Sequence, residues 1–462
     1  MKSSSKIIKS QAEQSNTNSL PALFPDTAGI DIGSKSHFVA VPADRDISPV
    51  REFSAFTGGL LEMVEWLKQC AIKTVIMEST GVFWIPAFEL LEGNGFDVKL
   101  VNARHVKNVS AHKTDVLDCQ WLQQLGTFGL LKSAFRPADM ILPLRAYLRH
   151  RDMLIKAAST HVQHMQKALT QMNLHLHNAV SDITGVTGMT IIRKIVAGET
   201  DPKILASFRD TRCRNPEEVI EASLVGNYRK EHLFSLSQAL DLYDFYTKKI
   251  TECDEQIQAE AKKFEAKCDK NRVEALARKA ANGKPRKLKK HEYNFDLTSE
   301  LVRITGVDLT KIPSIGASTA LSIVSEIGLD MTQWKSAKHF ASWLGLCPGN
   351  KVSGGKRLSG KSKPCKNRVA TALRVAANTL YQSQCAFGAF LRRMKGRLGS
   401  PKALTALAHK LAKLIYMMLR YGTEYVEKGV EFYEEMYRAR REISLRKKAK
   451  EMGYELVATA TA

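Results

Sequence analysis

Four carboxylates occupy positions that suit metal-dependent chemistry on phosphate. Asp31 interrupts an apolar run, where an unpaired charge is costly, and Glu78 ends a second apolar run. Asp115 and Asp118 are three residues apart in a segment that Thr114 can cap as a helix, so they share one helix face. Such a set can hold two Mg²⁺ ions about 4 Å apart, which stabilise the attacking and leaving oxygens of a phosphodiester.

Each carboxylate also has an ordinary explanation when it is taken alone. Asp115 suits the positive end of a helix dipole, and Asp118 could be a surface acid. The stretch from Asp31 to Ser34 also resembles the phosphate loop of sugar kinases and actin-like ATPases, but no second Asp-x-Gly loop or adenosine-binding Gly motif supports that function. The order of the four is that of the RNase H/RuvC fold, which favours a nuclease-type site.

A serine lies within a strongly basic segment. Residues 331–423 contain 18 Lys and Arg and no acid, and Ser353 stands there in the sequence Val-Ser-Gly-Gly-Lys. Such a serine can attack a phosphodiester while neighbouring cations stabilise the phosphorane. A plain phosphate-binding Ser-Gly loop fits the residues equally well. Upstream, residues 312–316 resemble a helix-hairpin-helix turn, whose glycine amides bind a DNA phosphate without reading sequence.

Several further residues are expected to contact nucleic acid. Cations near the acidic or the serine motif, together with the glycine of the hairpin-like turn, are the candidates. They are Lys113, Gly316, Lys351, Lys356, Arg357, Lys361, Lys363, Lys366 and Arg368.

The composition narrows the class of protein. The 462 residues include 69 Lys and Arg against 47 Asp and Glu, a formal charge of +22. This balance indicates a polyanionic partner. No window of about 18 apolar residues predicts a membrane helix, and residues 1–20 lack the apolar core of a secretory signal. Eight cysteines without zinc spacing are typical of reduced thiols in a cytosolic protein, so we expect a cytoplasmic location.

The charge is unevenly distributed along a chain that we divide into six segments. Residues 1–135 hold 13 Lys and Arg and 14 Asp and Glu, so the positive excess lies beyond them. We expect a mainly α-helical C-terminal part, with one helix over residues 367–391. The predicted segments are a disordered leader (1–25), an α/β catalytic domain (26–135), a helical or coiled-coil linker (136–263), a basic loop (264–298), a serine-bearing domain (299–425) and a charged helix (426–462).

Together these motifs resemble one family. The chain is similar to the DEDD serine transposases, the insertion-sequence family numbered 110 with its 1111 subgroup, which are RNA-guided (bridge-RNA) recombinases. The resemblance covers roughly residues 26–425 and rests on the order of the motifs. These are residues 29–35, 77–81 and 113–118 in the first domain, and residues 312–316, 344–348 and 352–356 in the serine-bearing part.

The resemblance implies a function and its partners. It implies an RNase H/RuvC-like domain whose carboxylates Asp31, Glu78, Asp115 and Asp118 bind Mg²⁺, and a serine, here Ser353, that forms a covalent phosphoserine link with DNA. It also implies a structured non-coding guide RNA, donor and target DNA, and a dimer or tetramer. One departure is the sequence at residues 364–367, Pro-Cys-Lys-Asn, where many members have Lys-x-Gly-Asn.

Two alternatives stay open from the residues. One is a RuvC-like metal-dependent nuclease, specific for DNA structure, that forms no covalent intermediate. The other is a nucleic-acid-binding protein with an inactive acidic site. A tyrosine recombinase is disfavoured, because no Arg/His-x-x-Arg array accompanies the tyrosines.

Overall fold

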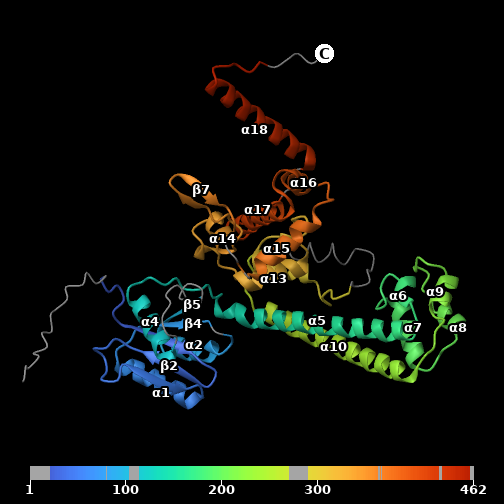
Figure 1. Cartoon of the computed structure of the whole chain (residues 1–462), viewed down its shortest axis with the longest axis horizontal. Coiled ribbons are helices and arrows are strands. Elements are labelled where there is room, and N and C mark those ends of the chain that lie inside the picture. The colour runs from blue at the N-terminus through green and yellow to red at the C-terminus, as the bar shows by residue number, and fades with distance from the viewer. Residues whose placement is uncertain are drawn as a thin grey trace, which may run out of the picture. The chain divides into compact units, whose positions relative to one another are not determined.

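The computed structural model describes residues 21–79, 81–102, 114–269, 290–362, 365, 367–425 and 429–457. The chain divides into two compact units, Met1–Arg136 and Pro137–Ala462. Figure 1 labels the helices and strands of each unit. The finer predicted division within the second unit stays a prediction.

A five-stranded mixed sheet forms the centre of the N-terminal unit. Its strands are β1 (Thr27–Ile32), β2 (Ser36–Ala40), β3 (Val50–Ser54), β4 (Thr74–Glu78) and β5 (Asp97–Val101). They lie in the order β3-β2-β1-β4-β5. Strand β2 is antiparallel to both β1 and β3, whereas β4 is parallel to both β1 and β5. This arrangement is compatible with the RNase H-like fold that the sequence predicts.

Helices cover both faces of this sheet. They are α1 (Thr57–Gln69), α2 (Trp84–Gly93) and α4 (Asp115–Thr127). Side chains alternate along a strand, and Ala28, Ile30 and Ile32 of β1 belong to the core that also contains residues of α1 and α2. On the opposite face, Ile76 and Val101 pack with Leu122 of α4. The sheet therefore lies between α1 and α2 on one face and α4 on the other.

A pair of long helices begins the C-terminal unit. After η1 (Asp139–Ile141), α5 (Leu142–Gln171) packs along α10 (Lys230–Lys262), as the sequence predicts for this helical region. Arg151 pairs with Asp254 and His161 stacks on Tyr246, so the two helices run antiparallel. Four shorter helices join their distal ends (Figure 1). These are α6 (Leu176–Ala179), α7 (Val186–Val196), α8 (Pro202–Ser207) and α9 (Glu217–Ser223).

The rest of this unit is mostly helical. Helix α17 is its central element, because α14, α15 and α16 all pack against it and eight of its residues are buried. The elements are α12 (Leu297–Thr305), η2 (Leu309–Lys311), α13 (Ala317–Ile327), η3 (Met331–Gln333), α14 (Ala337–Trp343), β6 (Lys351–Ser353), β7 (Lys356–Ser359), α15 (Arg368–Thr379), α16 (Ala386–Leu398), α17 (Ser400–Tyr421) and α18 (Gly429–Glu451). Within the described ranges, no helix has both the length and the apolar character needed to cross a membrane.

The prediction of one helix over residues 367–391 is wrong. The structure ends α15 at Thr379 and begins α16 at Ala386. Arg392 donates hydrogen bonds to the carbonyls of Tyr381 and Ser383, at 2.9 and 2.8 Å, so these carbonyls have partners outside a helix. The Cys385 side chain caps α16 by accepting from the amide of Gly388. These side-chain contacts stabilise the break.

Candidate functional site

Strands β1 and β4 bring Asp31 and Glu78 to adjacent positions. The parallel register pairs Ile30 with Met77, and the next residue on each strand is the carboxylate. Neighbouring strands are separated by about 4.8 Å. Ile76, two residues before Glu78, contacts the position of Gly126 in α4. Because side chains alternate along a strand, Glu78 lies on the face of the sheet that α4 covers.

The position of α4 places Asp31 on this same face. A Cβ at Gly29, two residues before Asp31, would lie 2.3 Å from the carbonyl oxygen of Cys119. Near the other end of the helix, a Cβ at Gly126 would lie 2.8 Å from the side chain of Thr27. Helix α4 therefore runs antiparallel to β1 at close range, and its first turn points toward the end of β1 that carries Asp31.

The first turn of α4 carries the other two carboxylates. Thr114 caps the helix as predicted, and its hydroxyl accepts a hydrogen bond of 3.3 Å from the amide three residues further on. Asp115 is exposed and Asp118 is half-buried. Burial, followed by the negative charges of Asp31 and Asp118, raises the pKa of Cys119 to about 12. These two carboxylates thus lie near the same buried thiol.

The four carboxylates lie toward one edge of the sheet, but their side chains do not converge on a common point. Among the described residues, no three His, Cys, Asp or Glu side chains are close enough to share a metal ion. The donors are all carboxylate oxygens, the ligands that Mg²⁺ prefers. They therefore fit Mg²⁺ in chemistry and in placement on one face. Their role as metal ligands stays a prediction.

Ser353 lies at the tip of a β-hairpin, not within an irregular loop. It ends β6 and is paired directly with Lys356, the first residue of β7. Gly354 and Gly355 form the two-residue turn with φ of 54° and 74°. A hairpin turn with positive φ at both central residues strongly favours glycine. Ser353 and Lys356 are both exposed, so the hairpin presents a hydroxyl and an ammonium group next to each other.

The other residues predicted to contact nucleic acid lie in several different elements. Lys361 is exposed, and Gly316 begins α13 with open space at its Cβ position. Lys351 lies in β6 and Arg357 in β7, and Arg368 begins α15. The other three, Lys113, Lys363 and Lys366, lie outside the described residues.

Comparisons with known proteins match the two parts that carry these motifs. A family described as "Transposase", of the DEDD IS110 type, matches residues 28–174. A family described as "Transposase IS116/IS110/IS902 family" matches residues 308–392. The first range includes the four carboxylates and the second includes Ser353. Both matched parts of the chain are therefore similar to IS110-family transposases.

One curated relative is similar to this chain over a limited length. It is the uncharacterized 43.6 kDa protein of insertion element IS110 from Streptomyces coelicolor. This relative is 30% identical over 129 residues, which are 27% of this chain and 31% of the relative. The match therefore spans about a third of the relative's length.

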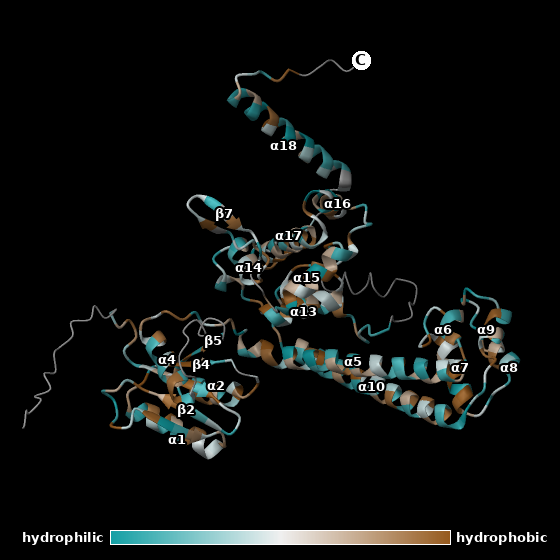
Figure 2. Cartoon of the chain, viewed as in Figure 1, coloured by the Kyte–Doolittle hydropathy of each residue, from teal (hydrophilic) through white to brown (hydrophobic). Residues whose placement is uncertain are grey.

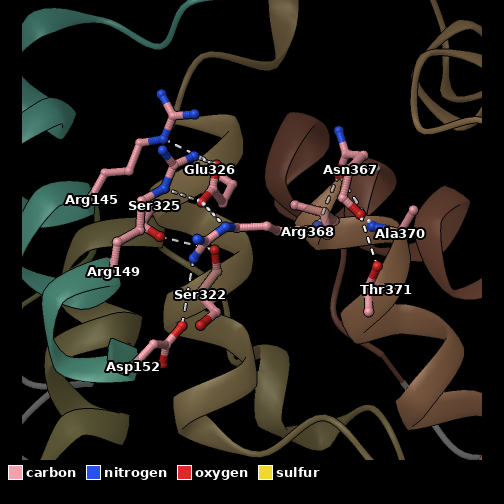
Figure 3. Close-up of polar contacts among 11 residues, drawn as sticks. Arg145, Arg149, Asp152, Ser322, Ser325, Glu326, Asn367, Arg368, Ala370 and Thr371 are labelled. Carbon is pink, nitrogen blue, oxygen red and sulfur yellow. Dashed lines mark hydrogen bonds and ion pairs between the residues drawn. The ribbon is translucent and has the colours of Figure 1, made fainter. Parts of the chain in front are cut away.

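The C-terminal unit also contains an arginine cluster that the sequence motifs did not predict. Glu326 of α13, with 13% of its side chain exposed, accepts hydrogen bonds from Arg145 at 3.0 Å and from Arg149 at 2.9 and 2.8 Å. Arg368 of α15 lies 4.0 Å from Glu326 and 3.7 Å from Asp152 (Figure 3). Arg368 thus has a structural role that its predicted phosphate contact did not include.

The sequence contains one signal for this cluster. Arg145 and Arg149 are four residues apart and share a face of α5. The pKa of Arg145 lies below its usual value. Burial is the main cause, and the charges of Arg149 and Arg368 add to it, whereas Glu326 opposes it. The cluster joins α5, α13 and α15, so it connects the long helix pair to the part of the unit that carries Ser353.

Proposed function

We propose that the chain is an RNA-guided DNA recombinase of an insertion sequence. It would cut and rejoin DNA through a covalent phosphoserine intermediate at Ser353. The observation that carries the proposal is the meeting of Asp31, Glu78 and the first turn of α4 at one sheet edge, within the part of the chain that is similar to transposases. This similarity favours chemistry on DNA.

Ser353 and its cross-strand neighbour supply the groups for strand exchange. The Ser353 hydroxyl oxygen would form a bond to phosphorus, and the bond from phosphorus to one deoxyribose oxygen would break. The serine proton leaves to a base or water, and the departing oxygen takes up a proton. Lys356, paired opposite Ser353, would stabilise the charge on the phosphorane. Rejoining reverses these steps with another deoxyribose hydroxyl.

Asp31, Glu78, Asp115 and Asp118 would hold Mg²⁺. When bound, Mg²⁺ stabilises negative charge on the attacking and leaving oxygens. Asp115 and Asp118 lie in the first turn of α4, where the positive end of the helix dipole attracts anions. The close packing of α4 on β1 would keep these two acids near Asp31.

The charge and the long helices support the proposed partners. Donor and target DNA and a guide RNA are polyanions, and the acid-free segment 331–423 offers 18 cations to them. Two DNA duplexes require more than one active site, so the protein would act as a dimer or tetramer. The α5–α10 pair is the proposed oligomerisation element.

A second candidate is a metal-dependent nuclease without a covalent intermediate. It is favoured by the placement of all four carboxylates in the one unit that has an RNase H-like strand order. In that case Ser353 would only bind phosphate. The two candidates agree on the need for the carboxylates and differ on the need for the serine hydroxyl.

The test is a strand-exchange assay with Ser353→Ala and Asp115→Asn. We expect each variant to lose strand cleavage and joining at least about 100-fold, because each removes a group that acts at the reacting phosphate. Wild-type protein should form a protein–DNA adduct that survives SDS, and Ser353→Ala should not. Ser359→Ala, in the same hairpin, is the matched control.

The outcomes distinguish the two candidate functions, and a further assay tests the need for a guide RNA. Cleavage that survives Ser353→Ala without an adduct, yet is lost in Asp115→Asn, would identify the nuclease. Guidance is tested by adding the element-encoded RNA to RNA-free protein, which should restore site-specific exchange. Exchange at the same sites without RNA would contradict the guided function.

A further inference from the structure

A groove lined by aromatic rings and cations lies between α16, α17 and α18. Its volume is about 680 Å³, within the roughly 300–1,000 Å³ of sites that hold small ligands. We call it the aromatic groove. Six of its lining residues carry the argument: Phe387, Phe390, Lys410, Tyr433, Tyr437 and Arg440.

The rings in the groove form two ordered pairs. Phe387 stacks on Tyr425 with centroids 5.8 Å apart and an angle of 16° between their planes. Phe390 meets Tyr433 edge to face at 6.2 Å. All four rings are half-buried, so helix packing holds them while part of each faces the groove. Fixed aromatic surfaces of this kind suit the stacking of a flat ring from a ligand.

Cations also line the groove. The Lys410 amine lies 4.1 Å from the centre of the Phe390 ring. Within the described residues, no carboxylate lies within 4.0 Å of Lys410, Arg440 or Arg441. Burial and the positive charges of Arg440 and Lys413 lower the pKa of Lys410. A ligand that brings an anion would relieve this repulsion.

The helices around the groove add to its positive character. Helices α16 and α17 lie within the segment that contains no acid, residues 331–423. Hydrophilic residues cover most of α18 (Figure 2), and its residues Arg440 and Arg441 face the groove. The groove therefore combines π-surfaces with an excess of positive charge, which favours an occupant with flat rings and negative groups.

We propose that the aromatic groove binds an unpaired nucleotide of a single-stranded nucleic acid. Its base stacks on the rings, and its phosphate contacts Lys410 and Arg440. A duplex keeps its bases stacked inside, so the groove discriminates against paired strands. This inference rests on the proposed function, because RNA-guided exchange exposes unpaired segments of guide and DNA.

The experiment measures binding of the full-length protein to labelled oligonucleotides by fluorescence anisotropy. The probes are an unstructured RNA of about 12 nucleotides, the DNA of the same sequence and the matching DNA duplex. Tyr437→Ala should weaken single-strand binding about 5- to 150-fold and leave duplex binding unchanged. Phe245→Ala is the matched control, because Phe245 is an exposed aromatic of α10 beside Lys249.

A second variant tests the phosphate contact without removing a ring. Arg440 lines the groove but is exposed, so Arg440→Gln should fold as the wild type does. It should reduce the slope of log affinity against log salt for single strands by roughly one. Equal weakening for RNA and DNA would identify a general single-strand site, whereas weakening for RNA alone would identify the guide as the occupant.

Other outcomes would overturn the proposal. If Tyr437→Ala and Arg440→Gln bind single strands as the wild type does, the groove is not a nucleotide site, and a protein segment becomes the better occupant. Equal loss of duplex binding would show a general basic surface instead. A wild-type protein that binds none of the three probes would contradict the proposed function itself, so the two failures are distinguishable.

Discussion

The contact between Gly29 and α4 sets the distance between two pairs of candidate metal ligands. At this position the helix backbone approaches the strand so closely that any Cβ would overlap it, at 2.3 Å from the carbonyl oxygen of Cys119 and 2.4 Å from the amide of Gln123. Both are backbone atoms, which cannot rotate away. The absence of a side chain at Gly29 therefore allows the first turn of α4 to stand beside Asp31.

We predict that Gly29→Ala separates α4 from β1. The forced shift should cost about 1–3 kcal/mol, as overpacking in a core does, and should lower the unfolding temperature in calorimetry. It should also reduce DNA cleavage, because Asp115 and Asp118 would move away from Asp31. Gly93→Ala in α2 is the matched control, because nothing lies within 4 Å of its Cβ position. Unchanged unfolding and cleavage in Gly29→Ala would contradict the proposed spacing.

The sequence could predict the start of α4 but not its position on the sheet. Thr114 is a local cap signal, and the helix begins where it predicts. The approach of α4 to Gly29 depends on residues about 90 positions apart, so no local pattern contains it. The order of the four carboxylates predicted a common site, and their role as metal ligands stays a prediction. Their separations in space depend on tertiary packing.

At the scale of elements, the strongest local patterns were predicted correctly. Glu78 ends β4, as the apolar run before it indicates, and the C-terminal part is mainly α-helical. Strand β3 was missed, because Arg51 and Glu52 interrupt its apolar character and both are exposed there. The hairpin β6–β7 could have been predicted, since two glycines between short extended segments indicate a two-residue turn.

The contacts of Glu326 join three helices of the C-terminal unit. We predict that Glu326→Ala loosens the junction of α5, α13 and α15, because Arg145 and Arg149 lose their shared carboxylate. The cost should be about 1 kcal/mol, because solvent reaches both arginines and partly replaces the lost carboxylate. Hydrogen exchange should speed up in the first turns of α5 and in α13.

A matched control and a contradicting outcome are available for this variant. Glu255→Ala removes an exposed glutamate of α10 and should leave exchange in α5 and α13 unchanged. Glu326→Gln keeps the shape and removes the charge, so it should give an intermediate effect. If Glu326→Ala exchanges at the wild-type rate throughout α5, the cluster does not hold these helices together.

At the scale of the whole molecule, the two units differ in charge. Residues 1–135 are nearly neutral, with 13 Lys and Arg against 14 Asp and Glu, and they contain the four candidate metal ligands. The positive excess lies in the remainder of the chain, and much of it lies around Ser353. Opposite requirements explain this separation, because carboxylates bind Mg²⁺ best where few cations compete, whereas polyanions require cations.

This distribution predicts where the salt dependence of duplex binding originates. Each cation that neutralises a DNA phosphate contributes about 0.9 to the slope of log affinity against log salt. Lys356 and Lys361 are exposed near Ser353, so the double variant Lys356→Gln, Lys361→Gln should lower the slope by about two. Lys132→Gln, an exposed lysine of the near-neutral unit, should leave it unchanged. Equal slopes for all three proteins would place the DNA-binding surface away from the serine hairpin.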